Sequence, residues 1–124
     1  MDIKKKILIV EDNKDLAAVY QSRLELEGFA TTLVSDGEKA LVTAIEVRPD
    51  LILLDVMMPE INGFDVLDIL KNTDNTRNIK IILLTALSQL KDKDQAARLG
   101  ADDYLVKSEA DLDNIVSCIR NCIA

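Results

Sequence analysis

Acidic side chains directly follow two short apolar runs of the sequence. Glu11 and Asp12 come after the run at residues 7–10, and Asp55 comes after the run at residues 51–54. Carboxylates gathered at one place repel each other, and a divalent cation removes that repulsion. The chain has no histidine, and oxygen-only ligands indicate Mg²⁺, with Mn²⁺ as the alternative. We expect Asp12 and Asp55 to bind the ion directly and Glu11 to bind it through water.

Two further predicted strands end in groups that suit phosphoryl transfer. Thr85 follows the apolar run at residues 81–84, and Lys107 follows the weaker strand expected at residues 103–106. A carboxylate can act as a nucleophile and form an aspartyl phosphate, and the transfer then depends on positioning and on neutralising the phosphoryl oxygens. We expect Asp55 to accept the group, while the cation, the Lys107 ammonium and the Thr85 hydroxyl each bind one phosphoryl oxygen. The small Ala86 leaves room for the group to enter.

Each of these residues has an ordinary structural explanation when taken alone. An acidic residue such as Asp12 after a strand often caps a helix, and Asn62-Gly63 is first of all a turn signal. Lys107 alone would be a solvated lysine, and Thr85 alone a β-branched residue at the end of a strand. The ordinary explanations do not account for all of these groups at successive strand ends.

The apolar pattern alternates five times between short continuous runs and longer helical periodicities. This alternation predicts an α/β fold in which crossover helices link parallel strands. The expected strands are residues 7–10, 30–34, 51–54, 81–84 and 103–106. Ligands of such sheets bind beyond the carboxyl ends of the strands, where the strand order reverses, so the polar groups above should meet at one edge.

Five helices are expected between and after these strands. The first has its apolar face at Leu16, Val19, Tyr20 and Leu24, and Gly28 ends it. Ser35 with Glu38 predicts a capping box for the second, Asn62 a cap for the third, and Ser108 with Asp111 a cap for the fifth. The fourth, at about residues 88–99, has few large apolar residues and a charged stretch at residues 91–94 that we expect to be solvated.

Length and composition restrict the class of protein. The chain has 124 residues, the size of one domain, and 48% of them are hydrophobic, which suffices for one core. A formal net charge of −7 opposes direct binding of nucleic acid. No apolar run could cross a membrane, so we expect a cytoplasmic protein. Cys118 and Cys122 close no loop and are expected to be reduced thiols.

The motifs together resemble those of a known family. They are Glu11-Asp12-Asn13, the stretch at residues 55–59 that begins with Asp55 and ends with Pro59, Asn62-Gly63, Thr85-Ala86, and residues 100–107 from Gly100 to Lys107. From end to end the chain is similar to response-regulator receiver domains of two-component signalling, including chemotaxis-regulator-like ones. We therefore expect residues 1–124 to form a single receiver domain.

The resemblance implies a flavodoxin-like fold: a doubly wound, five-stranded parallel sheet of order 2-1-3-4-5 with five helices, in three α/β/α layers. It implies that Asp55 takes a phosphoryl group, with Mg²⁺ present, from a sensor histidine kinase, a histidine phosphotransfer protein or a small phosphodonor. It also implies that the Met57 backbone carbonyl joins the metal ligands. Such a domain catalyses its own phosphorylation and dephosphorylation and is not an enzyme that turns over a separate substrate.

The resemblance further implies a switch. Phosphorylation would draw the Thr85 hydroxyl inward and let Tyr104 turn inward, which alters the face formed by the fourth helix, fifth strand and fifth helix. A plain half-buried strand aromatic is the other interpretation of Tyr104. The output would be a downstream protein or an output domain outside this chain, and the domain would be a monomer or a weak, phosphorylation-dependent homodimer.

Three positions of the chain bear on how this chemistry would be tuned. Met57 and Leu87 are apolar at positions that influence access of hydrolytic water in the family, so we expect a comparatively long-lived aspartyl phosphate. Ser108 stands where the family usually has a proline, often after a cis bond. A cis bond costs about 2.5–4 kcal/mol before a residue other than proline, so we expect Lys107–Ser108 to be trans.

Three other functions compete with the receiver. A flavin-binding electron carrier would need a phosphate-binding loop after the first strand, where the acidic residues from Glu11 onward would repel the phosphate. An aspartyl phosphatase would need a second carboxylate where Met57 stands. A pseudo-receiver would bind a partner without phosphorylation, and Ser108 makes it the strongest of the three.

Overall fold

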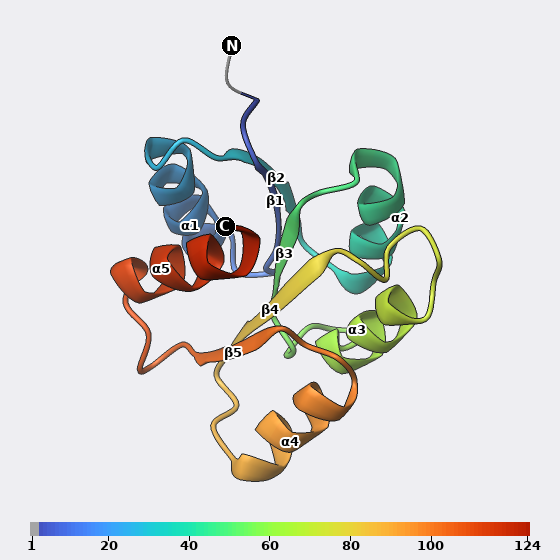
Figure 1. The fold of residues 1–124 in the computed structure, drawn as a ribbon. Coiled ribbons are helices and arrows are strands. Elements are labelled where there is room, and N and C mark those ends of the chain that lie inside the picture. Colours follow the sequence, from blue (N-terminus) through green and yellow to red (C-terminus); the bar gives the residue numbers. More distant parts are fainter. Residues whose placement is uncertain (1–2) are drawn as a thin grey trace.

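Five parallel strands form the single sheet of this computed structural model, which describes residues 3–124 (Figure 1). The strands are β1 Lys6–Val10, β2 Ala30–Val34, β3 Leu51–Leu54, β4 Lys80–Thr85 and β5 Asp103–Val106. Their order, β2-β1-β3-β4-β5, confirms the predicted flavodoxin-like fold. The order reverses between β1 and β3, where Val10 pairs with Leu54, so the residues that follow these two strands emerge side by side.

Helices cover both faces of the sheet, which produces the predicted three layers (Figure 1). The helices are α1 Lys14–Leu26, α2 Gly37–Val47, α3 Gly63–Lys71, α4 Leu90–Arg98 and α5 Leu112–Ile123. One hydrophobic cluster joins the sheet to α2, α3 and α4, and the other joins it to α1 and α5. None of the helices in residues 3–124 is both long enough and apolar enough to span a membrane.

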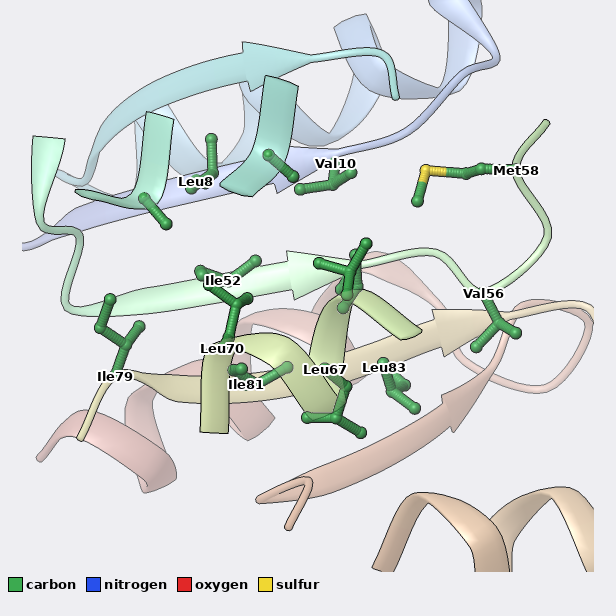
Figure 2. Packing of buried hydrophobic residues seen from close by; sticks show 14 of the residues in the cluster. Leu8, Val10, Ile52, Val56, Met58, Leu67, Leu70, Ile79, Ile81 and Leu83 are labelled. Carbon is green, nitrogen blue, oxygen red and sulfur yellow. The ribbon is translucent and has the colours of Figure 1, made fainter. Parts of the chain in front are cut away.

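The central strands β3 and β4 are apolar along residues 51–54 and 81–84 because both of their faces are covered there. Residues 51–54 of β3 are at most 2% exposed, and residues 81–84 of β4 are at most 3% exposed. In Figure 2, Ile52, Ile81 and Leu83 of the sheet lie among Leu67 and Leu70 of α3. Each such side chain stabilises the fold by about 1.5–3 kcal/mol on burial. The polar residues at the strand ends therefore stand on a rigid support.

The helix caps agree with the predictions at two positions and differ at two others. Gly28 follows the end of α1 with φ +94°, and the Asn62 side chain caps α3, both as predicted. The α2 cap is Asp36 and not Ser35, because the Asp36 carboxylate accepts the Lys39 N–H at 2.8 Å. The α5 cap is Asp111, which forms a capping box with Asn114. Ser108 lies in a turn before that helix and does not cap it.

Two predictions about burial on the helices were wrong. Val19 is 47% exposed, because the buried face of α1 consists of Ala17, Tyr20 and Leu24. Asp92 is only 9% exposed, although it belongs to the stretch expected to be solvated. It shares the buried face of α4 with Ala96, one turn later, which places a carboxylate near the sheet.

Candidate functional site

The three predicted acidic residues lie together at the carboxyl end of the sheet. Glu11, Asp12 and Asp55 each offer a carboxylate oxygen within 4.8 Å of the others. Backbone pairing fixes two of them, since the Asp55 N–H donates to the Val10 carbonyl and the Glu11 N–H donates to the Val34 carbonyl, both at 3.1 Å. Glu11 and Asp55 are 4% exposed, whereas Asp12 is exposed to solvent.

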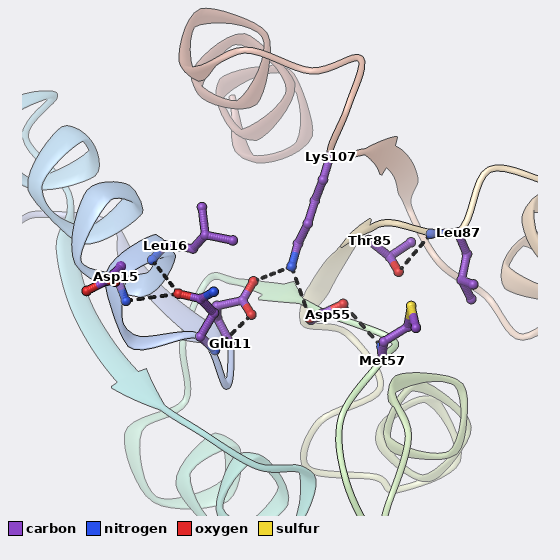
Figure 3. Close-up of polar contacts among 9 residues, drawn as sticks. Glu11, Asp15, Leu16, Asp55, Met57, Thr85, Leu87 and Lys107 are labelled. Carbon is purple, nitrogen blue, oxygen red and sulfur yellow. Dashed lines mark hydrogen bonds and ion pairs between the residues drawn. The ribbon is translucent and has the colours of Figure 1, made fainter.

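Lys107 reaches from the end of β5 into this acidic cluster (Figure 3). Its ammonium donates to Glu11 Oε1 at 2.6 Å and to Asp55 Oδ2 at 3.1 Å. The Lys107 N–H donates to the Thr85 carbonyl at 2.8 Å, which fixes where the side chain starts. No cis peptide bond occurs in residues 3–124, so Lys107–Ser108 is trans, as expected.

Burial and charge act in opposite directions on this ion pair. Burial lowers the pKa of Lys107, but the hydrogen bond that its ammonium donates to Glu11 and the charge of Asp55 outweigh this effect and hold the pKa above its ordinary value. Burial also raises the pKa of Glu11, and the hydrogen bond from Lys107 offsets only part of that rise. The ammonium therefore stays protonated between two carboxylates.

The second oxygen of Asp55 is held by the backbone. The Met57 N–H donates to Asp55 Oδ1 at 3.1 Å, so both oxygens of the carboxylate have defined partners. Gly63 packs against the same residue: a Cβ at this position would lie 2.3 Å from the Asp55 carbonyl oxygen. Sequence reasoning took Gly63 as part of a turn and missed this close approach, which only the packing of α3 against β3 reveals.

Thr85 and Tyr104 are linked through one residue of the β4–α4 loop. The buried Thr85 hydroxyl accepts the Leu87 N–H at 3.3 Å, and the Tyr104 hydroxyl donates to the Leu87 carbonyl at 2.8 Å. Within residues 3–124, no hydrogen bond joins Thr85 to Asp55. Burial raises the pKa of Tyr104 to about 12, and the nearby Asp92 carboxylate adds to the effect.

A hollow of about 540 Å³ opens beside the acidic cluster. It is lined by Asp12, Val56, Met57, Met58, Pro59, Asn62, Phe64 and Leu87. Met57 is 55% exposed there, and Ala86, next to Thr85, is exposed as well. The lining of this hollow is mainly apolar, with Asp12 as its one charged residue.

Comparison with known families decides the class of the protein. A family model described as "Response regulator receiver domain" matches residues 7–120. The chain belongs to this family. Receiver domains are signalling modules of two-component systems and not turnover enzymes, and they typically bind Mg²⁺ through acidic residues.

Curated relatives of this receiver domain are longer proteins. The chain is 36% identical over 115 residues to the DNA-binding dual master transcriptional regulator RpaA of Synechocystis sp., a match that covers 93% of this chain and 47% of that protein. It is 39% identical over 105 residues to the DNA-binding response regulator MtrA of Mycobacterium leprae, a match that covers 85% and 45%. The chain thus spans about half the length of the curated relatives it matches.

Solved structures agree with the receiver fold. The signal receiver domain of a signal transduction histidine kinase from Syntrophus aciditrophicus superposes with a TM-score of 0.88 at 35% identity, covering 96% of this chain and 89% of that one. The Francisella response regulator 1452 receiver domain superposes with a TM-score of 0.90 at 30% identity, covering 97% of both chains.

The donor set of this receiver domain fits a hard divalent cation. Three carboxylates within 4.8 Å of one another offer only oxygen ligands, which Mg²⁺ prefers and Mn²⁺ accepts. Asp12 is exposed, so a cation and its remaining waters can approach from solvent. Glu11, Asp12 and Asp55 would hold the ion.

Proposed function

We propose that Asp55 accepts a phosphoryl group, in the presence of Mg²⁺, from a histidine kinase or a histidine phosphotransfer protein. We further propose that phosphorylation changes the α4–β5–α5 face, and that this face controls a downstream protein or an output domain. The observation that carries the proposal is the Lys107 ammonium, which contacts Asp55 Oδ2 and Glu11 Oε1 inside the acidic cluster. Acceptor, counter-charge and metal-binding oxygens thus meet at one point.

The acceptor carboxylate performs the transfer as a nucleophile. An Asp55 oxygen attacks phosphorus, the new O–P bond forms as the N–P bond to the donor imidazole breaks, and the imidazole leaves with the electron pair. Lys107 keeps its proton and follows the charge onto a phosphoryl oxygen, while the Thr85 hydroxyl donates to another. The cation, held by Glu11, Asp12, Asp55 and the Met57 carbonyl, would neutralise charge on the group.

The link through Leu87 would carry the signal outward. If the Thr85 hydroxyl turns to a phosphoryl oxygen, the Leu87 N–H loses its acceptor. The Leu87 carbonyl accepts the hydrogen bond from the Tyr104 hydroxyl, so a shift of Leu87 also reaches Tyr104. Helix α4 resists such a shift weakly, because it buries only Asp92 and Ala96 and its cap residue Gln89 makes no side-chain hydrogen bond. A two-state element of this kind responds to a few new charge-assisted contacts.

The apolar mouth favours a long-lived phosphoryl group. Met57 and Leu87 line the approach to Asp55, and neither side chain can hydrogen-bond to an attacking water through an oxygen or nitrogen atom. Ala86 is small enough to leave room for the donor. Decay of the adduct within seconds in Mg²⁺ buffer would contradict this part of the proposal.

Intact mass after incubation with acetyl phosphate tests the proposed chemistry. We expect one added phosphoryl group in the wild type, only with Mg²⁺ present, and none in Asp55→Asn. Asn keeps the size of the side chain but removes the nucleophilic carboxylate. Absence of an adduct with every phosphodonor would support the pseudo-receiver instead, a module that binds its partner without phosphorylation.

A further inference from the structure

The sulfur atoms in residues 3–124 differ sharply in their exposure. Met57 is 55% exposed, whereas its neighbour Met58 is 8% exposed. Cys118 is buried and its thiol donates to Asp103 Oδ2 at 2.9 Å, while Cys122 is half-buried. Met57 is thus the one thioether of this part of the chain that faces solvent broadly.

The two thiols are chemically protected, and they are buried in Cys118 and half-buried in Cys122. Burial and then the hydrogen bond to Asp103 raise the pKa of Cys118 far above its ordinary value. Burial raises the pKa of Cys122, and the charges of Asp102 and Asp103 add to this. The thiolate is the form that attacks a peroxide oxygen, so both cysteines react slowly at neutral pH. A thioether needs no deprotonation.

We propose that Met57 is an oxidation site for peroxide-type oxidants, and that its sulfoxide shortens the life of the phosphoryl group on Asp55; the second half rests on the proposed function. A lone pair of the Met57 sulfur attacks one peroxide oxygen, so an S–O bond forms as the O–O bond breaks. The departing oxygen takes up the protons and leaves as water. Sulfur is oxidised by two electrons, and hydrogen peroxide is reduced.

The position of the sulfur explains why this modification would affect the phosphoryl group. The Met57 side chain lines the same hollow as Asp12 and Leu87, beside Asp55 (Figure 3). A sulfoxide replaces an apolar group with a strong hydrogen-bond acceptor. The acceptor can bind and orient a water near phosphorus, where a thioether excludes it. The Met57 N–H that holds Asp55 Oδ1 belongs to the backbone, so the acceptor carboxylate keeps its position.

Peptide mapping during a hydrogen peroxide time course tests the site itself. We expect Met57 to be oxidised several-fold faster than Met58, with Cys118 and Cys122 still reduced when Met57 is fully converted. This measurement needs no phosphorylation. Oxidation of Met58 or of either cysteine at the same rate as Met57 would overturn the assignment of the site.

The lifetime of the phosphoryl group tests the consequence. Wild type, Met57→Leu and Met58→Leu are each compared before and after peroxide, with catalase added before acetyl phosphate and Mg²⁺. After peroxide, we expect the phosphoryl group to decay about 3- to 10-fold faster in wild type and in Met58→Leu, and at an unchanged rate in Met57→Leu. This acceleration is smaller than the ~100-fold minimum typical of a positioned general base, because the sulfoxide only orients the water. Methionine sulfoxide reductases should restore the original rate.

The outcomes separate this inference from the proposed function. An unchanged decay rate in fully oxidised wild type, or the same acceleration in Met57→Leu, would overturn the inference alone. Failure to form any adduct before peroxide would overturn the proposed function and, with it, the effect on hydrolysis. The mapping result would still decide the oxidation site.

Discussion

Replacing Lys107 by methionine removes an ammonium that contacts two buried carboxylates and keeps most of the aliphatic stem. At an effective dielectric constant of about 20, unit charges at 2.6 Å and 3.1 Å attract by about 6 and 5 kcal/mol. Desolvation and ordering of the lysine offset much of this attraction. Breaking a buried ion pair costs about 3–5 kcal/mol in practice, and the Lys107 side chain is 20% exposed, so we expect a loss of about 3 kcal/mol in the free energy of unfolding.

The loss should depend on pH and on metal. Burial raises the pKa of Glu11 above its reference value of 4.5, and the hydrogen bond from Lys107 opposes this rise. A carboxyl group whose pKa is raised on folding stabilises the fold while it is protonated, and that stability is lost as pH rises through the folded-state pKa. The variant lacks the opposing hydrogen bond, so its deficit should grow from pH 4.5 toward neutral pH. Mg²⁺ should stabilise the variant more than the wild type, because no ammonium competes for the carboxylates.

Urea titrations at two pH values, with Mg²⁺ or with EDTA, measure these differences. Lys91→Met is the matched control, since Lys91 is exposed and makes no ion pair in residues 3–124. A Lys107→Met deficit equal to that of the control, or one that does not change with pH, would refute the electrostatic account of the site.

Three further predictions follow from other contacts. Gly63→Ala should lose about 1–3 kcal/mol of stability and slow phosphorylation of Asp55, because the new Cβ would meet backbone atoms of Asp55 and Val56. The control Gly37→Ala should lose stability in urea titration but keep the phosphorylation rate measured by intact mass. Tyr104→Phe should lose about 1 kcal/mol and speed amide exchange in the β4–α4 loop, and unchanged exchange there would contradict the link. Arg120 and Arg23 lower the pKa of Glu27. The stability lost in Glu27→Gln should therefore be seen at neutral pH and should disappear as pH falls from the ordinary pKa through the lowered one, or in molar salt. A stability difference that depends on neither pH nor salt would contradict the ion pairs.

The sequence predicted the central strands because burial on both faces leaves a continuous apolar run. The edge strands β2 and β5 are only partly buried, and the alternation of strands and helices predicted them. The expected strands at residues 30–34, 51–54 and 103–106 have the same bounds in the structure, and the other two extend by one or two residues at their ends. The helix starts were harder, because several polar residues before a helix can each act as its cap. The sequence pattern placed Asp111 as the capping-box partner of Ser108, whereas in the structure Asp111 itself is the cap and accepts the hydrogen bond from the Asn114 N–H.

The candidate site was predictable in its members and less so in its contacts. Parallel strands place their carboxyl ends at one edge, so Glu11, Asp55 and Lys107 had to lie near one another. That the ammonium approaches Glu11 more closely than Asp55 depends on side-chain packing, which spacing does not encode. The burial of Asp92 likewise depends on how α4 turns toward β5.

Borohydride reduction tests the central claim, that Asp55 carries the phosphoryl group, most directly. Borohydride converts an aspartyl phosphate to homoserine, which sequencing of peptides by mass spectrometry locates. After treatment with acetyl phosphate and Mg²⁺, we predict homoserine at position 55 and at no other acidic residue, and none when EDTA replaces Mg²⁺. Homoserine at position 12, or the corresponding alcohol one carbon longer at position 11, would contradict the account. A mass shift without any reduced product would contradict it as well.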